Sequence, residues 1–288
     1  MKTLKIQSVS SSIKKIYSKY LNINKPISFV LTSTNHGTMI VNKNDFNSNK
    51  SFQYGVGHQL LTSSSFDQVE IDVTKALIAK RRQYYKDEVL VIDCGANIGV
   101  HTIEWAKMIN GWGRVLSFEA QDKLFYALAG NIVLNNCLNV TAENYVIGKN
   151  NGNFKVPALD FNIPSSFGSL ELKKSSTSEY IGQELNPNKN KETKMISLDS
   201  LNLNRCDFIK IDVEGMEEEV LLGSKNLINK CRPILLIEHI KSNNENLTQF
   251  FEKNFYKLFY LGINILAVHE SDYVLKDLII VNDVLEIK

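Results

Sequence analysis

Carboxylates and one histidine recur in this sequence at the points where short apolar runs end. They are Asp93, Glu119, Asp212, Glu214, Glu238 and His239. Apolar runs of about four to eight residues are typical of strands that are buried on both faces of a sheet. If these strands are parallel, their carboxyl ends meet at one edge, where open α/β sheets bind nucleotide-like ligands. The pattern therefore predicts an acidic ligand site assembled from several strand ends.

A glycine turn follows the first of these strands, in the stretch Asp93-Cys-Gly-Ala-Asn-Ile-Gly99. Its two glycines allow a tight bend and a close approach of backbone to ligand. The stretch lacks the Lys-Ser/Thr of a P-loop and the second glycine of a dinucleotide fingerprint. S-adenosylmethionine has a ribose, an adenine and an amino-acid tail but no phosphate, so it suits this turn better. Asp93 would lie near its amino group, and Glu119 would accept hydrogen bonds from its ribose diol.

Strands and helices alternate around these residues, which predicts an α/β fold with parallel strands and right-handed crossovers. The expected strands cover residues 89–92, 114–119, 140–146, 207–212 and 233–240, and 256–260 and 278–281 form an antiparallel closing pair. The expected helices cover residues 67–84, 98–109, 123–135, 217–227 and 246–253.

Two less regular segments flank the core. Residues 1–66 form an N-terminal extension with an amphipathic helix at Ile13–Leu21, a hairpin over 27–41, and a glycine-flanked loop that carries Tyr54 and His58. Residues 150–195 form an insertion with Phe167 and Ser169 at its centre. Long irregular loops in compact domains are often functional, so we expect both segments to shape a substrate pocket and the extension to offer an oligomer contact. The main domain is predicted over residues 67–288.

The charge and the apolar content of the chain bear on whether it binds nucleic acid or a membrane. The chain has 33 basic and 31 acidic residues among 288, a net charge of +2, which gives no electrostatic case for nucleic acid or an anionic membrane. The sequence has neither a signal peptide nor an apolar run of the roughly 20 residues that span a bilayer, so we expect a soluble, cytoplasmic protein without membrane insertion. The sequence leaves a homodimer open.

Four motifs, together with Asn131 to Asn135, resemble the FkbM family of methyltransferases over about residues 54–239. They are Ile92-Asp-Cys-Gly-Ala-Asn-Ile-Gly99, Phe118-Glu-Ala120, Ser197-Leu-Asp-Ser-Leu201 and Ile209-Lys-Ile-Asp-Val-Glu-Gly-Met-Glu217. The resemblance implies a Rossmann-like class I methyltransferase fold with helices on both faces. Its sheet would have seven mostly parallel strands in the order 3-2-1-4-5-7-6, with strand 7 antiparallel.

The resemblance also implies S-adenosylmethionine as cofactor and assigns its contacts residue by residue. They are Asp93, Gly95, Ala96, Asn97, Gly99, His101, Thr102, Glu119, Ala120, Asn144 and Asp212. The residues of the glycine turn would line the methionine half, and Glu119 the ribose. Ala120 and Asn144 would lie near the adenine, and Asp212 near the methyl group. Ala96-Asn97 replaces a glycine found in many class I enzymes, a change that is usual for this family.

Methyl transfer to a hydroxyl needs an aligned acceptor oxygen and a base that removes its proton. The catalytic candidates are Asp212, Glu214, Glu238 and His239, with His239 or Glu238 favoured as the base because histidine titrates near neutral pH. Asp212 and Glu238 could instead hold a divalent cation, an alternative that ranks lower. The acids Glu217-Glu-Glu219 are expected on a solvated helix face.

The predicted function is S-adenosylmethionine-dependent O-methylation of a sugar, a glycan or a related secondary metabolite, the acceptors common in the family. The substrate contacts expected from the two irregular segments are Tyr54, His58, Phe167 and Ser169. A non-catalytic or scaffold role in a glycan-biosynthesis complex is the alternative, and a nicotinamide-dependent oxidoreductase ranks third.

Overall fold

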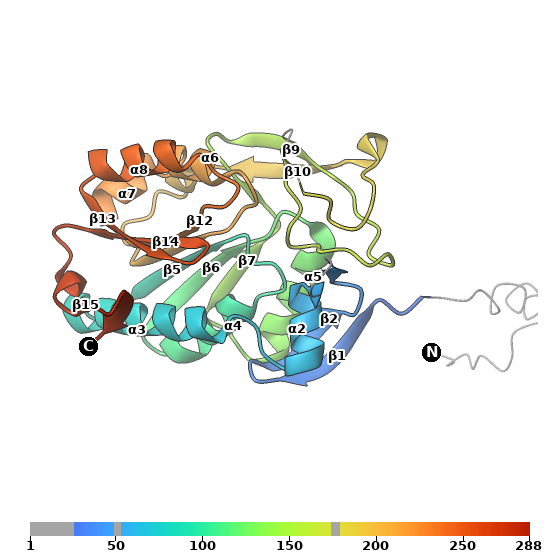
Figure 1. The fold of residues 1–288 in the computed structure, drawn as a ribbon, viewed down its shortest axis with the longest axis horizontal. Helices are drawn as coiled ribbons and strands as arrows, with labels where there is room; N and C mark the ends of the chain where they lie inside the picture. Colours follow the sequence, from blue (N-terminus) through green and yellow to red (C-terminus); the bar gives the residue numbers. More distant parts are fainter. Residues whose placement is uncertain (1–25, 49–52, 174–178) are drawn as a thin grey trace, which may run out of the picture.

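A seven-stranded sheet forms the centre of the protein in the computed structural model, which describes residues 26–48, 53–173 and 179–288 (Figure 1). The strand order is β13-β14-β12-β11-β5-β6-β7. The strands are β5 (Val89–Cys94), β6 (Gly113–Phe118), β7 (Val140–Glu143), β11 (Phe208–Ile211), β12 (Ile234–Glu238), β13 (Tyr256–Leu261) and β14 (Asn264–His269). The pairs among β7, β6, β5, β11 and β12 are parallel, and β14 is antiparallel to β12 and β13. The predicted order 3-2-1-4-5-7-6 is confirmed.

The predicted position of the seventh strand is wrong. Residues 278–281 form β15 (Leu278–Val281), which pairs with β16 (Val284–Ile287) in a separate hairpin. The partner of β13 is β14, which follows it after Gly262 and Ile263. Gly262 has a φ of 62°, which suits a two-residue hairpin turn, and so short a connection makes the two strands immediate neighbours.

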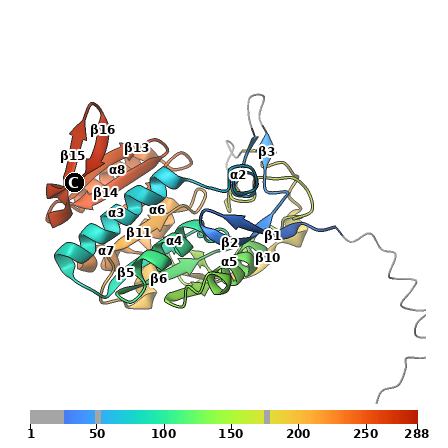
Figure 2. The same ribbon diagram turned by 90° about the horizontal axis from the view of Figure 1, so that it is seen from below.

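Helices cover both faces of the sheet (Figures 1 and 2). The first set is α3 (Gln68–Tyr85), α4 (Val100–Ile109) and α5 (Asp122–Leu134), and the second is α6 (Glu217–Leu222), α7 (Lys225–Cys231) and α8 (Asn244–Lys253). The helix predicted over 217–227 is thus two helices, separated at Gly223 and Ser224. A Cβ on Gly223 would lie 2.1 Å from the carbonyl oxygen of Gly148, so the backbones meet closely at this break.

Side chains of each central strand alternate between two apolar cores. Val89 and Val91 belong to the core under α3, α4 and α5, whereas Ile92 and Cys94 belong to the core under the second helix set. Strand β11 alternates in the same way, with Phe208 on the first side and Ile209 and Ile211 on the second. Since side chains of a strand point alternately to its two faces, Asp93 and Lys210 continue the first series.

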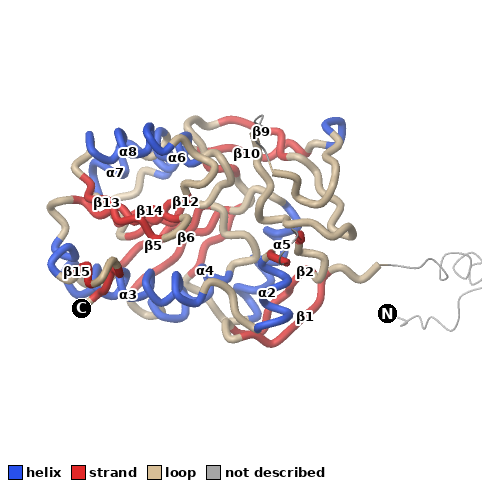
Figure 3. Tube along the Cα trace, viewed as in Figure 1, coloured by secondary structure: helices blue, strands red, loops and turns tan. Residues whose placement is uncertain are grey.

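The N-terminal extension packs beside α5 (Figure 3). Its hairpin consists of β1 (Phe29–Thr34) and β2 (Gly37–Asn42), as predicted, followed by β3 (Asn47–Ser48), β4 (Gln53–Tyr54) and α2 (Val56–Ser63). The buried amide of Asn131 in α5 accepts from the Ile40 N–H and donates to the Ile40 and Ile98 carbonyls. The helix expected at Ile13–Leu21 lies outside the described residues.

The insertion is more regular than expected. β9 (Gly152–Val156) and β10 (Lys191–Ile196) join β8 (Val146–Ile147) in a three-stranded sheet. Three 3-10 turns complete the described structure, at Pro187–Lys189, Leu198–Leu201 and Tyr273–Lys276. Across the described ranges, no helix combines the length and apolar character that crossing a membrane requires.

Arg81 forms two buried ion pairs near the amino-terminal ends of the parallel strands. Its guanidinium lies 3.3 Å from Asp207 before β11 and 2.5 Å from Asp272 before the last 3-10 turn, and all three side chains are buried. Arg81→Leu should lower the free energy of unfolding by about 3 kcal/mol, because it leaves a buried carboxylate without its cation. Unfolding by urea measures this loss of free energy.

The neighbouring Arg82 provides the matched control. Its partner Asp87 is 62% exposed, so Arg82→Leu should lower the free energy of unfolding by at most about 1 kcal/mol. Equal losses in the two variants would show that the Arg81 ion pairs contribute nothing specific.

Candidate functional site

A cavity of about 390 Å³ opens at the carboxyl ends of β5, β6, β11 and β12. Twelve residues singled out from the sequence line it: Asp93, Gly95, Ala96, Asn97, His101, Glu119, Ala120, Asp212, Glu214, Glu238, Tyr54 and Ser169. Six others do not line it: Gly99, Thr102, Asn144, His58, Phe167 and His239. The structure therefore brings most of the predicted acids together around one space.

The glycine turn forms the floor of the cavity. The N–H groups of Gly95 and Ala96 both donate to the Phe118 carbonyl, which joins the turn to the end of β6. Gly95 has a φ of 84°, and a Cβ there would lie 1.7 Å from the Asp212 carbonyl oxygen. Only glycine combines this backbone conformation with so close an approach to the turn after β11.

Glu119 closes the same turn from the next strand. Its carboxylate accepts from the Asn97 N–H at 2.9 Å and from the Gln121 N–H at 2.8 Å. Burial raises the pKa of Glu119 to about 7, although both hydrogen bonds oppose the shift. Asn144 does not reach the cavity; its amide donates to the Glu119 and Ala120 carbonyls and so supports this corner from behind.

Asp93 presents an unsatisfied oxygen. Its Oδ2 accepts from the Thr102 hydroxyl at 2.6 Å, whereas its buried Oδ1 has no hydrogen-bond partner. Burial raises the pKa of Asp93, and the nearby Lys210 ammonium counteracts part of that rise. Thr102 thus orients the carboxylate rather than facing a ligand, and Asp93 Oδ1 remains available as an acceptor at the floor of the cavity.

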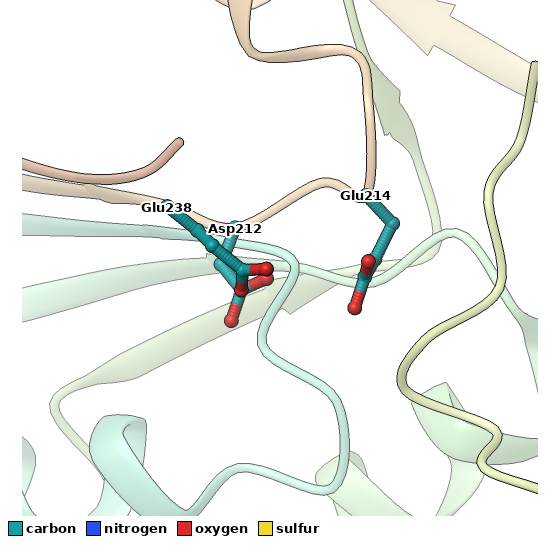
Figure 4. Close-up of side chains that lie close together, drawn as sticks. All are labelled: Asp212, Glu214 and Glu238. Atoms are coloured by element: carbon teal, nitrogen blue, oxygen red, sulfur yellow. The ribbon is translucent and has the colours of Figure 1, made fainter. Parts of the chain in front are cut away.

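Asp212 and Glu238 form a carboxyl pair at the ends of β11 and β12 (Figure 4). Burial, followed by the charges of Asp212 and Glu214, raises the pKa of Glu238 to about 10. Burial also opposes ionisation of Asp212, but the Lys210 ammonium at 2.6 Å and the hydrogen bond from Glu238 lower its pKa. The pair therefore holds one proton at neutral pH, on Glu238, and Asp212 is its ionised member.

Glu214 reaches toward this pair from the turn that follows β11 (Figure 4). Burial and the Asp212 charge raise the pKa of Glu214 to about 8, against the Lys241 ammonium with which it forms an ion pair. Lys241 also donates to the Ser169 carbonyl of the insertion, at 3.1 Å. Lys241 thus connects the acidic cluster to the segment that covers the cavity.

Glu217 supports the turn that carries Glu214. Its side chain is 2% exposed, and it accepts from the Val213 and Gly215 N–H groups and from the Ser242 hydroxyl. The expectation that residues 217–219 form a solvated helix face is wrong for this residue. The preceding backbone turns back through Glu214 and Gly215, both with positive φ, and this brings its unpaired N–H groups over the Glu217 carboxylate.

The oxygens of Asp212, Glu214 and Glu238 lie within 4.8 Å of one another, a spacing that a divalent cation could bridge. Lys210 pairs with Asp212, Lys241 pairs with Glu214, and the pKa values of Glu214 and Glu238 are both raised. We assign no metal to this cluster.

The two candidates for the base lie on opposite faces of the sheet. Glu238 follows Leu236 on the side of α4, whereas His239 follows Ile237 on the side of α8. His239 Nδ1 lies 2.9 Å from Asn244 Oδ1 at the start of α8, and its ring packs against Tyr260. The structure thus brings Glu238, and not His239, to the cavity.

Asp45 joins the extension to the insertion. Its buried carboxylate accepts from the Gly57 N–H at the start of α2 and from the Phe167 N–H of the insertion. Burial raises the pKa of Asp45 to about 6 against these two hydrogen bonds. The predicted Gly55–Gly57 loop is therefore the beginning of a helix, and Phe167 is a core residue that packs on Phe161.

Among the predicted substrate contacts, Tyr54 and Ser169 line the cavity. His58 lies on α2 and packs against Phe46 instead.

Sequence reasoning missed several polar residues that line or support the cavity, among them Glu70, Gln121, Lys210 and Lys241. Lys210 carried a usable signal, because a lysine inside the apolar strand Phe208–Ile211 requires a buried partner. Gln121 and Lys241 follow strand ends without any pattern, and Glu70, on α3, reaches His101 at 3.0 Å only through helix packing.

Comparison with known proteins gives one family match. Residues 93–258, more than half of the chain, match the model of the methyltransferase FkbM domain. Among curated proteins, none matches the sequence significantly.

Solved structures give distant matches. A methyltransferase FkbM from Methylobacillus flagellatus is 18% identical with a TM-score of 0.45, over 64% of this chain and 44% of that one. A precorrin-6y C5,15-methyltransferase from Geobacter metallireducens is 14% identical with a TM-score of 0.40, over 77% and 91%. The M. jannaschii TYW2 in complex with AdoMet is 13% identical with a TM-score of 0.39, over 85% and 86%. The match thus spans less than half of the Methylobacillus protein.

Gly95 offers a test of the contact between the two turns. Gly95→Ala should lower the free energy of unfolding by about 3 kcal/mol or more, because the added Cβ combines backbone strain with a clash against Asp212. Gly111→Ala is the matched control, since Gly111 has a φ of 83° but no atom within 4 Å of the added Cβ. Chemical denaturation should show a difference of about 2 kcal/mol between them. Equal losses would mean that the close approach to Asp212 does not constrain the turn.

Proposed function

This chain belongs to the FkbM methyltransferase family, and from that premise we propose that it transfers a methyl group from S-adenosylmethionine to a hydroxyl oxygen. The observation that carries the proposal is the set of hydrogen-bond acceptors around the cavity. Asp93 Oδ1 and Gln121 Oε1 are buried without partners, and the Glu119 carboxylate has acceptor capacity beyond its two backbone hydrogen bonds.

These acceptors fit the donors of S-adenosylmethionine. Asp93 would hold the amino group, Glu119 the ribose hydroxyls, and Gln121 the adenine amino group. Apolar side chains close the adenine end of the cavity, among them Leu124, Val146 and Ile147. The acidic cluster would favour a cationic sulfonium over the neutral thioether that remains after transfer.

When bound, S-adenosylmethionine supplies an electrophilic methyl group, and the chain must align an acceptor oxygen and accept its proton. We assign the proton to Asp212, the ionised member of the carboxyl pair. Glu238 donates a hydrogen bond to Asp212 and so orients it, and Glu214 lies beside them with Lys241 as its partner. His239 would support this edge from the opposite face.

Residues on one side of the cavity suit an acceptor with several hydroxyl groups, such as a sugar, a glycan or a related secondary metabolite. Tyr54 offers an aromatic face, and Ser169 and Glu214 offer polar groups that can bind hydroxyls. We propose that described residues of the extension, such as Tyr54, and of the insertion, such as Ser169, form this side, and that residues 67–288 carry the transfer chemistry.

Cofactor binding tests the assignment of Glu119. Wild-type protein should bind S-adenosylmethionine in calorimetry, and Glu119→Gln should weaken binding about 10- to 100-fold, because it loses charged hydrogen bonds to the ribose. Glu143→Gln is the control, since Glu143 ends the adjacent strand β7 without lining the cavity. No binding by the wild type would contradict the proposed function, and equal affinities of both variants would contradict the role of Glu119.

Methyl transfer tests the reaction itself. Incubation of the protein with methyl-labelled cofactor and a glycan extract of the host should label a hydroxyl oxygen. Asp212→Asn should lower turnover by about 100-fold or more, because it removes the proton acceptor. Cofactor binding without transfer to any acceptor would favour the non-catalytic alternative, and a labelled nitrogen or carbon would overturn O-methylation.

A further inference from the structure

Lys210 is a cation buried inside the proposed cofactor cavity. It is 6% exposed, it lines the cavity, and its ammonium lies 2.6 Å from Asp212 Oδ2. In the sheet register it pairs with Asp93 of β5, so the two side chains lie next to each other on the same face. Burying a lysine is unfavourable unless acids compensate its charge, and here burial is outweighed by Asp212, Glu70 and Asp93, which raise its pKa.

Charged groups face the Lys210–Asp212 pair from every element around it. Helix α3 and its N-terminus contribute Glu70 and Asp67, and α4 contributes His101, which lies 3.0 Å from Glu70. Strands β5, β6 and β12 contribute Asp93, Glu119 and Glu238, and the turn after β11 and α6 contribute Glu214 and Glu217. The segment after β12 adds a second lysine, Lys241, which pairs with Glu214, so Lys210 and Lys241 together face many carboxyl groups.

A lysine is an unexpected residue in a cavity that is proposed to receive a sulfonium cation, because the two positive charges repel each other. The hydrogen bond from Lys210 to Asp212 explains why a lysine is found here. The Asp212 side chain lies between the Lys210 ammonium and the Glu238 carboxyl group, and it accepts from both. Asp212 therefore has fixed donors before any ligand arrives, which fixes both its charge and its orientation.

We infer that Lys210 is a positioning residue for methyl transfer: it keeps Asp212 ionised and oriented toward the acceptor, and so leaves the shared proton on Glu238. This inference rests on the proposed function, because it takes Asp212 as the group that receives the acceptor's proton. Without the ammonium, Asp212 and Glu238 would share the proton more evenly, and Asp212 would lose a fixed hydrogen bond.

The pH dependence of cofactor affinity reports this role. A neighbouring cation favours the carboxylate, so removing it allows Asp212 to take up a proton at a higher pH. Protonated Asp212 attracts a sulfonium less, so the pH below which affinity falls should rise by at least about one unit in Lys210→Met. Lys210→Arg keeps the charge and should stay close to the wild type.

Comparing kcat with KM should show whether Lys210 acts on the chemical step or on binding of the acceptor. At pH 7, Lys210→Met should lower kcat by about tenfold or more with a much smaller change in the KM for the acceptor. Lys75→Met is the matched control. Lys75 forms an ion pair with Glu104 at 2.8 Å, and neither residue lines the cavity, so the pH profile should not move.

The outcomes are distinguishable. Failure of the wild type to bind S-adenosylmethionine at any pH would overturn the proposed function. Binding by the wild type with an unmoved profile in Lys210→Met would overturn only the role of Lys210. If Lys210→Met does not fold, carboxyl carbon NMR of the wild type decides: we expect Asp212 to stay ionised and Glu238 to stay protonated at neutral pH. The reverse assignment would overturn the inference.

Discussion

The site depends on one constraint: parallel strands covered by helices on both faces end at a common edge, and their side chains alternate between those faces. Asp93, Lys210 and Glu238 continue the apolar series on the side of α3, α4 and α5, so they reach one space. His239 continues the other series and reaches α8 instead. Adjacent residues in the sequence therefore lie on opposite faces of the sheet, and only Glu238 of the two lines the cavity.

Charge balance is the second constraint, and it follows from the first. Placing several carboxyl groups on one buried face would be unfavourable if all were ionised, because their charges would repel in a poorly solvated space. The structure compensates with Lys210, Lys241 and a proton on Glu238. The negative charge of the cluster is therefore balanced when no ligand is bound, while the ionised Asp212 can still attract a cationic ligand.

Much of the core could be predicted from the sequence because its signals are local. Apolar runs, the spacing of Gly95 and Gly99, and the acids at strand ends predicted the parallel strands and most residues around the cavity, and the resemblance to the family implied the sheet order. The prediction failed where a short turn or the face of a strand decides which residues meet. The seventh strand was assigned to the more apolar run at 278–281, although the short turn at Gly262 makes β14 the neighbour of β13. Glu217 is buried instead of solvated because the turn before it folds back over its carboxylate, and His239 faces α8 because it follows the other face of the strand.

The N-terminal extension and the insertion show why the identity of the methyl acceptor is harder to infer from the sequence than the cofactor. Asp45, more than a hundred residues earlier, accepts from the Phe167 N–H, and Gln121 donates to the Phe167 carbonyl, which together place Gly168 beside the glycine turn. A Cβ on Gly168 would lie 2.8 Å from the Asn97 amide, so the insertion touches the turn directly. Lys241 completes the connection by binding Ser169 and Glu214. The proposed acceptor side thus combines residues from three segments whose contacts no local pattern encodes, whereas the proposed cofactor side follows from strand ends that are neighbours in the sheet.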